Sequence, residues 1–330
     1  MMRALLHERY GEADALRVGQ APEPTPGNGQ VLIDVRAASV NAADVFLMRG
    51  VPRLVRPGNG LRSPKKTKMG LDVSGVVRAV GPGVTRWGVG DAVFGEGTAT
   101  FAELAVARED RLAALPDGVC FEHAATVAVA GCAALKAIEV AKVEAGQRVV
   151  VTGAAGGVGQ FAAQLAKLRG AEVIAVCSGR NVERVRALGI DTVLDYETQN
   201  PLTTSEPYDV VIDNAGAIRI RDWRKVVRKT GTILPNSGVR GPDGGAIMRV
   251  AKAQWHGLVA PQHVRTFLSQ ASNDALDELG AHLAAGRISP LVDTMFALEH
   301  APQAIARVGT NHARGKVIVT MGEEAREAQS

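Results

Sequence analysis

Short apolar stretches separated by turn residues fill roughly the first third of the chain. Residues 30–37 read as a strand after a loop rich in proline and glycine, and residues 72–80 and 91–94 read as further strands bounded by glycines. Short apolar stretches with regular turn residues between them are typical of short strands. The pattern over residues 2–122 therefore predicts a small β-barrel rather than a parallel sheet.

From about residue 124 the pattern changes to continuous apolar runs that alternate with amphipathic segments. The runs have the composition of strands buried on both faces of a parallel sheet, and they cover residues 149–152, 172–176, 209–212 and 232–234. The amphipathic segments, which we expect to be helical, cover residues 160–169, 181–188 and 219–229. This alternation predicts βαβ units and a doubly wound sheet.

The last part of the chain adds a helix and a strand. Residues 273–285 fit a helix with Asn273 or Asp274 near its N-cap and Gly286 just past its end. Residues 314–320 read as a strand, which we expect to return to the first domain.

Composition narrows the possible partners. The 38 basic and 34 acidic side chains leave a net charge of +4, and aromatic residues make up 4% of the chain. These values favour neither a nucleic acid nor a membrane as partner. The three cysteines are too few for a disulfide framework, and charge comes too early at the N-terminus for a secretory signal. We expect a cytoplasmic protein with reduced thiols.

A basic stretch at residues 53–68 stands apart, because it carries six lysine or arginine residues together with prolines and glycines. Charge runs are usually solvated loops. The alternative is a lid over the substrate that favours an anionic or oxygen-rich ligand.

The strongest motif is a glycine-rich loop between the apolar run at 149–152 and the amphipathic segment at 160–169. Gly153, Gly156 and Gly159 mark the tight turn and the close backbone approach that a pyrophosphate needs, and the first turn of the following helix offers N–H groups to the anion. The strand before it and the helix after it are the context that supports this motif. We therefore predict that the loop binds a dinucleotide through residues 153 and 155–159: Gly153, Ala155, Gly156, Gly157, Val158 and Gly159.

The second apolar run suggests which dinucleotide is bound. An acidic residue about 20 positions after the glycines would bind the ribose 2′-hydroxyl of NAD, but this run ends in Cys177, Ser178, Gly179 and Arg180. Ser178 and Arg180 can hydrogen-bond a phosphate instead. We therefore expect NADPH, although Arg180 can also be read as an ordinary exposed residue before a helix.

The glycine loop also fits the pattern of short-chain dehydrogenases, which use a Tyr-x-x-x-Lys pair. The three tyrosines of this chain are Tyr10, Tyr196 and Tyr208, and the residues four positions later are Asp14, Asn200 and Ile212. No lysine follows at that spacing, so that mechanism is excluded.

Taken together, the motifs resemble the medium-chain dehydrogenase/reductase superfamily, and more closely its zinc-free quinone oxidoreductase branch. The resemblance covers nearly the whole chain and rests on residues 38–44, 70–81, 90–95, 128–135, the glycine loop, 180–189 and 312–319. It implies an α/β protein with two domains. One is a GroES-like β-barrel catalytic domain at 1–123, completed by 290–330, and the other is a Rossmann NADP-binding domain at 124–289.

Zinc-dependent relatives in that superfamily bind a catalytic metal through Cys, His-Glu and a later Cys or Asp. Here Asn41 stands where the first cysteine is expected, and Gly-Leu-Asp at 70–72 replaces Gly-His-Glu. The cysteines are scattered, whereas a structural zinc site needs four closely spaced ligands and a catalytic one needs three. We expect no metal.

The resemblance also implies where the remaining site residues lie. Asn41 and Asp44 are expected beside the nicotinamide and the substrate as candidate catalytic residues, with the Asn41 amide donating to a carbonyl oxygen. Alternative roles are a buried turn residue for Asn41 and a helix cap for Asp44. Further cofactor-binding positions are expected at Tyr196, Asn214, Asn236, Ser237 and Lys316.

The resemblance implies a zinc-independent NADPH-dependent oxidoreductase that transfers hydride to a quinone or an α,β-unsaturated carbonyl. One alternative is a pathway-specific carbonyl reductase or alcohol dehydrogenase of a natural product. Another is a non-catalytic NADPH-binding redox sensor. The expected partners are the small-molecule substrate and, since relatives often form dimers, a second copy of the chain.

Overall fold

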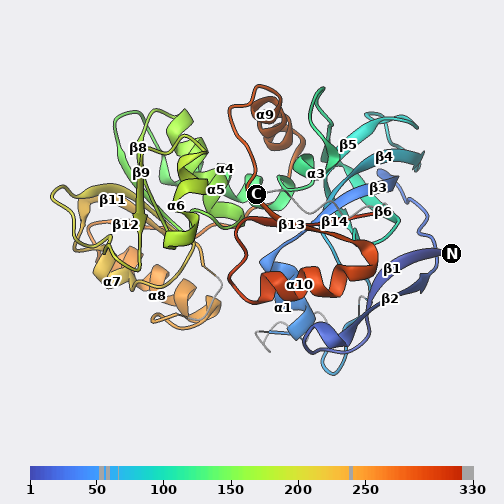
Figure 1. Cartoon of the computed structure of the whole chain (residues 1–330), viewed down its shortest axis with the longest axis horizontal. Coiled ribbons are helices and arrows are strands. Elements are labelled where there is room, and N and C mark those ends of the chain that lie inside the picture. The colour runs from blue at the N-terminus through green and yellow to red at the C-terminus, as the bar shows by residue number, and fades with distance from the viewer. Residues whose placement is uncertain (52–55, 57–59, 66, 238–240, 322–330) are drawn as a thin grey trace. The chain divides into compact units, whose positions relative to one another are not determined.

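The computed structural model describes residues 1–51, 56, 60–65, 67–237 and 241–321 of the chain (Figure 1). These residues pack into two compact units, each with its own hydrophobic core. Unit 1 comprises residues 1–132, 270–286 and 292–330, and unit 2 comprises residues 133–269 and 287–291. Residues 270–286 therefore lie in unit 1, although they fall within the range 124–289 expected for the nucleotide-binding domain. The predicted domain bounds stay a prediction.

Unit 1 is built on a mainly antiparallel sheet that curves on itself, in which β13 and β14 pair in parallel. The sheet order is β13-β14-β3-β4-β5-β6, and β3 pairs with β6 as well as with β4. The strands are β3 (Gln30–Val40), β4 (Asp72–Val80), β5 (Ala92–Thr98), β6 (Leu104–Ala114), β13 (Val292–Ala297) and β14 (Lys316–Thr320). β1 (Met2–His7) and β2 (Leu16–Ala21) form a separate antiparallel pair. The pairing of β3 with β6 closes β3 to β6 into the small barrel that the turn pattern predicts.

The C-terminal strand returns to unit 1, as the sequence predicts. β14 pairs antiparallel with β3, so that Val317 lies opposite Val40. Apolar side chains of β3, β4 and β14 fill the core of the unit together with α10 (Ala301–Gly309), for example Ile33, Val73 and Ile305. The other helical segments of unit 1 are η1 (Ala13–Ala15), α1 (Ala42–Arg49), α3 (Phe121–Ala124), α9 (Asn273–Ala284) and η4 (Leu298–His300).

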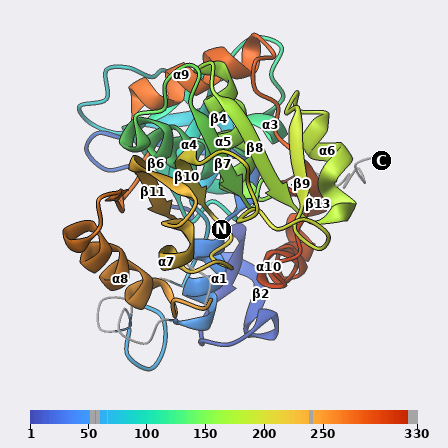
Figure 2. The same ribbon diagram turned by 90° about the vertical axis from the view of Figure 1, so that its left-hand side faces the viewer.

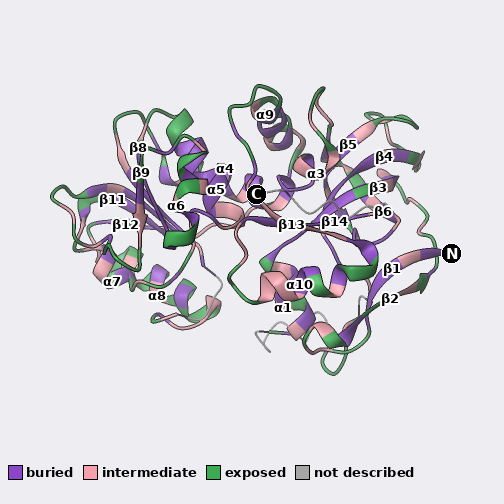
Figure 3. Cartoon of the chain, viewed as in Figure 1, coloured by how far each residue is buried: buried purple, intermediate pink, exposed green. Residues whose placement is uncertain are grey.

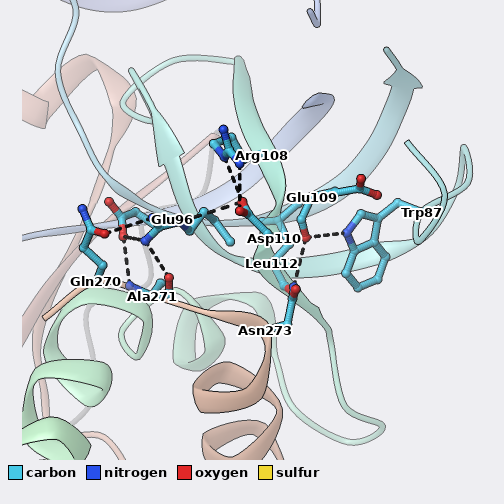
Figure 4. Close-up of polar contacts among 10 residues, drawn as sticks. Trp87, Glu96, Arg108, Glu109, Asp110, Leu112, Gln270, Ala271 and Asn273 are labelled. Carbon is cyan, nitrogen blue, oxygen red and sulfur yellow. Dashed lines mark hydrogen bonds and ion pairs between the residues drawn. The ribbon is translucent and has the colours of Figure 1, made fainter. Parts of the chain in front are cut away.

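The segment that leads into α9 is bound to β5 and β6 by side chains that reach across a large sequence distance (Figure 4). Asn273 Nδ2 donates to the backbone oxygens of Glu109, at 3.0 Å, and Leu112, at 2.6 Å. Arg111 donates to the Ala271 oxygen at 2.7 Å, and the Ala271 N–H donates to Glu96 at 3.2 Å. These bonds fix residues 270–273 to unit 1.

Unit 2 is built on a parallel sheet. Its strand order is β12-β11-β10-β7-β8-β9, and β11, β10, β7, β8 and β9 are labelled in Figure 2. The strands are β7 (Arg148–Thr152), β8 (Glu172–Cys177), β9 (Thr192–Asp195), β10 (Tyr208–Asp213), β11 (Val227–Pro235) and β12 (His263–Val264). β7 is the first of these strands in the chain. The chain continues from β7 to β8 and β9 on one side and then crosses to β10 on the other side, so the strand order reverses at β7. Such a switch point is where doubly wound sheets bind nucleotides.

Helices accompany the strands of unit 2 in the alternation that the sequence predicts. They are α5 (Gly157–Leu168), η3 (Gly179–Asn181), α6 (Val182–Arg186), α7 (Ile220–Trp223) and α8 (Ala246–Val259), while the division between the units falls within α4 (Ala128–Ala141). The described residues include no helix long and apolar enough to cross a bilayer.

Several sequence predictions need correction. The helix predicted at 219–229 ends at Trp223, and β11 begins at Val227. The N-cap of α9 is Ser272, whose side chain accepts from Ala275 N, because Asn273 uses its amide on β6 instead. The helix α8 was not predicted from the sequence. Much of the basic stretch at 53–68 lies outside the described residues, so its role as a lid stays a prediction.

Candidate functional site

The glycine loop lies at the switch point of the unit 2 sheet. It connects the end of β7 to the start of α5, and Gly153 has a φ of +62°, a conformation that glycine adopts without strain. A Cβ on Gly159 would lie 2.1 Å from the Gly153 oxygen, so a side chain at this position has no space. The first N–H groups of α5, at Gly157, Val158 and Gly159, are those that an α-helix leaves without partners of its own. The loop therefore fits the diphosphate of a dinucleotide.

The loop after β8 holds the residues predicted to choose between NADPH and NADH. Ser178 is buried and accepts a hydrogen bond from Asn181 Nδ2 at 3.0 Å, while Arg180 is exposed. The Tyr196 N–H donates to the Cys177 oxygen at 3.1 Å, so the end of β9 lies against the end of β8. The Tyr196 side chain is 58% exposed. The structure thus brings Ser178, Arg180 and Tyr196 to the same edge of the sheet.

β9 also brings a carboxylate to this loop. A Cβ on Gly179 would lie 2.7 Å from Asp195 Oδ2. The Asp195 carboxylate accepts from the Glu197 N–H at 3.0 Å, which fixes its direction. No acid directly follows the second strand in the sequence, whereas Asp195 comes from the third strand and was not predicted. The feature of the sequence that could have identified Asp195 is its position directly before Tyr196, at the end of a neighbouring strand.

The ends of β10 and β11 complete this edge. Asn214 Nδ2 donates to the Thr152 oxygen at 3.2 Å, and Asn236 Nδ2 donates to Asn214 Oδ1 at 2.8 Å. Ser237 Oγ donates to the Ala215 oxygen at 3.2 Å. The structure therefore links Asn214 and Asn236 by hydrogen bonds to the end of β7, and it bonds Ser237 to Ala215, the residue after Asn214.

Asp213 anchors these strand ends and was not predicted as a functional residue. Its buried carboxylate accepts from Thr152 Oγ1 at 2.6 Å, from the Gly216 N–H at 3.0 Å and from Trp223 Nε1 at 3.2 Å, and it forms an ion pair with Arg249. These partners come from β7, α7, α8 and the loop after β10. Asp213 therefore fixes the strand ends relative to one another.

A cavity of about 180 Å³ opens beside Asn236 and Ser237. Its other lining residues are mainly apolar: Leu234, Pro235, Ala246, Val250, Arg265, Thr266 and Phe267. A pocket with apolar walls and a few polar groups at one end is typical of small-molecule sites.

Unit 1 holds the other predicted residues in a buried polar cluster. Lys316 Nζ donates to Asn41 Oδ1 at 2.7 Å and to Asp72 Oδ2 at 3.1 Å. Asn41 Nδ2 donates to the same Asp72 oxygen at 2.9 Å and to the Ser39 oxygen at 3.4 Å. Lys316 was predicted near the cofactor, and the structure places it with Asn41. The Asn41 amide, predicted to donate to a substrate carbonyl, directs both N–H groups into the protein.

Asp72 is the residue of this cluster that the sequence analysis missed. Its carboxylate is fully buried and also accepts from Ser39 Oγ at 2.5 Å and from the Val129 N–H at 2.8 Å. The Lys316 ammonium compensates its charge at 3.1 Å. The sequence showed Asp72 only as a departure from the zinc-binding pattern.

Asp44 lies at the start of α1, where its Oδ2 accepts from the Asn41 N–H at 2.8 Å. This bond is the helix-cap role that the sequence analysis gave as an alternative. Asp44 is fully buried and its Oδ1 has no partner among the described residues. Burial, with a smaller contribution from the Asp72 charge, raises the pKa of the Asp44 carboxyl to about 7. Near neutral pH this carboxyl is therefore partly protonated.

The residues that the structure describes form no site that fits a zinc ion. The described part of the chain contains no group of three or more His, Cys, Asp or Glu side chains placed to hold a metal. Burial raises the pKa of the Cys132 thiol to about 12 and that of Cys177 to about 11, whereas zinc binds the thiolate. The Asp72 carboxylate already has a counterion, the ammonium group of Lys316, in the place where a metal ion would have to bind.

Comparisons with known proteins agree with this architecture. Residues 27–117 match the family model of the alcohol dehydrogenase GroES-like domain, and residues 188–319 match that of the zinc-binding dehydrogenases. The chain is 31% identical over 334 residues to the chloroplast envelope quinone oxidoreductase homolog of Arabidopsis thaliana, covering 97% of this chain and 98% of the relative.

Two further proteins resemble the chain along nearly all of its length. The chloroplastic NADPH-dependent alkenal/one oxidoreductase of Arabidopsis thaliana is 32% identical, covering 96% of this chain and 79% of the relative. Among solved structures, the quinone oxidoreductase from Coxiella burnetii has a TM-score of 0.84 at 29% identity, covering 97% of this chain and 99% of the other.

Proposed function

Since the chain belongs to the medium-chain dehydrogenase/reductase superfamily, in its quinone-oxidoreductase-like branch, we propose that it is an NADPH-dependent, zinc-independent oxidoreductase that reduces a quinone or an α,β-unsaturated carbonyl. The observation that carries this proposal is the glycine loop at the switch point of the unit 2 sheet. At Gly159 a Cβ would lie 2.1 Å from the Gly153 oxygen, so the start of α5 packs directly against the loop, as a dinucleotide-binding glycine motif requires. The relatives named for quinones and for alkenals support the substrate class.

In this proposal the bound nicotinamide supplies a hydride, and the residues of the chain position the reactants. The N–H groups at the start of α5 bind the diphosphate, and Asn214, Asn236 and Ser237 bind the sugar and amide groups that follow it. Lys316, held by Asn41 and Asp72, places a positive charge in the cluster.

The charges at the end of β8 bear on the choice of coenzyme. Arg180 can form charge-assisted hydrogen bonds with a 2′-phosphate, and Ser178 lies in the same loop. Asp195 favours the alternative, NADH, because a carboxylate repels a phosphate and accepts a hydrogen bond from a ribose hydroxyl. The relative named for NADPH supports NADPH here.

The coenzyme proposal is tested by the Michaelis constants for NADPH and NADH in the wild type, Arg180→Ala and Asp195→Asn. A charge-assisted hydrogen bond contributes about 1.5–3 kcal/mol, so Arg180→Ala is expected to raise the KM for NADPH by roughly 10- to 100-fold without changing that for NADH. Arg228→Ala is the matched control, because Arg228 pairs with Asp209 near the start of β10, at the other end of the sheet. NADH would be established as the coenzyme if the wild type had a lower KM for NADH than for NADPH and if Asp195→Asn raised the KM for NADH.

The substrate proposal is tested by a panel of acceptors that includes phenanthrenequinone, a simple enone and an aldehyde. We expect NADPH oxidation with the quinone and the enone. Tight NADPH binding with little turnover of these acceptors would favour a pathway-specific carbonyl reductase. NADPH binding without turnover of any acceptor would favour a redox sensor. The expected cytoplasmic location stays a prediction.

A further inference from the structure

Two glutamines of α5 bind the backbone of residues 289 and 291 as a neighbouring strand would. The Leu291 N–H donates to Gln160 Oε1, and Gln160 Nε2 donates to the Leu291 oxygen at 3.4 Å. One turn further along the helix, the Ser289 N–H donates to Gln164 Oε1 at 2.8 Å, and Gln164 Nε2 donates to the Ser289 oxygen at 3.0 Å. A side-chain amide carries a donor and an acceptor, as a peptide unit does. These four bonds, which we call the glutamine clamp, thus satisfy the backbone of a segment that belongs to no sheet.

Burial makes the clamp costly to open. Residues 159–166 of α5 are all buried (Figure 3). Gln160 is fully buried, and Gln164 is only 4% exposed. Gln164 Nε2 also donates to the Gln160 oxygen at 3.0 Å, which connects the two halves of the clamp. Separating the segment from α5 would leave buried amide groups without partners. Residues 289–291 are therefore held firmly to this helix.

The clamp begins in the first turn of the helix that is expected to bind the coenzyme. Gln160 directly follows Gly159, and its own N–H donates to the Gly156 oxygen at 3.2 Å. The N–H groups of residues 157–159, which we expect to bind the diphosphate, are less than one helical turn away. Because a helix is rigid over so short a length, a shift of this turn carries Gln160 and Leu291 with it.

The clamped segment leads directly into β13. Val292 follows Leu291 and lies in register opposite Lys316 of β14, and the register shifts immediately after Val292. Asp293, at this irregularity, pairs with Arg307 of α10 at 2.6 Å. A bulge of this kind interrupts the regular pairing of a strand. The position of Val292 beside Lys316 therefore depends on what holds Leu291 as well as on the rest of β13.

A continuous series of contacts thus leads from the glycine loop to the buried polar cluster. The clamp lies within unit 2, the pairing of Val292 with Lys316 lies within unit 1, and the peptide bond after Leu291 joins them. Lys316 in turn donates to Asn41 and Asp72. Rigid elements joined by hydrogen bonds are the kind of structure that carries energetic coupling between sites.

We propose that Gln160 and Gln164 are positioning residues, which tie Lys316 and its cluster to the helix that binds the coenzyme. Diphosphate bound at the start of α5 holds the clamp, and the clamp holds β13 and Lys316. A misplacement of reacting groups by about 1 Å lowers a rate by as much as 100-fold, so a fixed cluster favours hydride transfer. The inference rests on the proposed function, because it takes the glycine loop as the coenzyme site and the cluster as part of the reaction site.

The double variant Gln160→Met/Gln164→Met tests the proposal in the full chain, since methionine keeps the length of glutamine but forms no strong hydrogen bond. We expect the kcat of NADPH oxidation with phenanthrenequinone to fall roughly 5- to 30-fold, the range over which residues between two sites modulate their coupling. The KM for NADPH is expected to change less than about two-fold, because the N–H groups of residues 157–159 remain. The single variant Gln160→Met, which keeps the bonds to Ser289, is expected to show a smaller decrease in kcat and serves if the double variant folds poorly.

Gln262→Met is the matched control. Gln262 is a buried glutamine of unit 2, and its amide also binds backbone, donating to the Arg224 oxygen at 3.0 Å and the Val227 oxygen at 3.4 Å. Its loss is expected to lower the free energy of unfolding, as the loss of the clamp does, but to leave kcat unchanged. A clamp variant with the kcat of the wild type, or a control that loses as much kcat as the clamp variant, would overturn the proposal.

Hydrogen exchange with and without NADPH gives a second readout, which a purely structural role of the glutamines would not change. NADPH is expected to slow exchange at residues 289–297 in the wild type and in Gln262→Met but not in the double variant, whereas exchange at the glycine loop slows in all three. A wild type whose glycine loop responds to NADPH while residues 289–297 do not would contradict the clamp. Failure of the proposed function differs from this result, because the glycine loop would then not respond to NADPH, or NADPH would bind and slow exchange at both places without being oxidised.

Discussion

Lys316 lies 275 positions from Asn41 and 244 from Asp72 in the sequence, yet its Nζ is within hydrogen-bond distance of both. The cause is the antiparallel pairing of β14 with β3, in which Val317 lies opposite Val40. Asn41 and Asp44 stand out in a local motif and were predicted. The contact with Lys316 was not, because no local pattern states which strands will pair.

The pKa of Asp44 leads to a prediction at the same scale. Its pKa is about 7 in the folded protein and near 3.8 when unfolded, so the folded state binds the proton more tightly. The contribution of Asp44 to stability therefore falls as the pH rises from about 4 to about 7, and then stays constant. The Asp44→Asn variant has no carboxyl group at this position, so it does not lose stability in this way as the pH rises. We expect the variant to gain stability over the wild type as the pH rises, by at most about 4 kcal/mol, since one pKa unit corresponds to 1.36 kcal/mol.

Urea unfolding of both proteins at pH 5 and pH 8 (values on either side of the folded pKa) measures this difference. The exposed Asp191 provides the control, because its side chain is 92% exposed. Asp191→Asn is expected to change stability by a similar small amount at both pH values. A stability difference for Asp44→Asn that does not grow with pH would contradict the assigned pKa.

At the scale of elements, local pattern predicts those strands and helices whose apolar side faces the core. The strands at β7, β8 and β10 were recognised as buried apolar runs, and α5 as a segment amphipathic in the usual sense. The helix α8 was not predicted, because its apolar side faces solvent and its pattern therefore differs from that of a helix that covers a sheet. The helix predicted at 219–229 failed because tertiary pairing overrides propensity, and β11 joins the sheet through Val227.

The segment before α9 shows how one side chain secures an element. Asn273 Nδ2 satisfies two backbone oxygens of β6. Asn273→Ala leaves the Leu112 oxygen without this donor, which costs about 1–3 kcal/mol, while the Glu109 oxygen still accepts from Trp87 Nε1 at 3.2 Å. We expect a corresponding decrease in the free energy of unfolding, measured by urea denaturation. Gln270→Ala, which removes an exposed bond to Arg111 in the same segment, is the control and is expected to cost less than about 0.5 kcal/mol. Equal losses in the two variants would contradict this role of Asn273.

At the scale of the whole molecule, the pattern of apolar and polar residues predicts the two architectures, the small barrel and the doubly wound sheet. It does not predict to which unit some segments belong. The switch from short strands to continuous apolar runs indicates a barrel followed by a doubly wound sheet, and the structure contains both. Residues 270–286 follow the last strand of that sheet and were grouped with it. They lie in unit 1 because of contacts such as that of Asn273 with Leu112, which join positions 161 apart.

The last prediction concerns metal, because the family model that matches residues 188–319 is named for zinc binding. In the described part of the chain the available donors are dispersed, and the carboxylate at Asp72 is already surrounded by Lys316, Asn41 and Ser39. Replacing the Lys316 ammonium with a metal would leave that lysine buried and unpaired, at a cost of several kcal/mol. Prolonged treatment with ortho-phenanthroline is therefore expected to leave the rate of NADPH oxidation and the melting temperature unchanged. The meta isomer, which does not chelate, controls for binding of the ring system itself. Stoichiometric zinc by mass spectrometry, lost together with activity on chelation and recovered with added zinc, would show that Asp72 or another group binds metal despite these contacts.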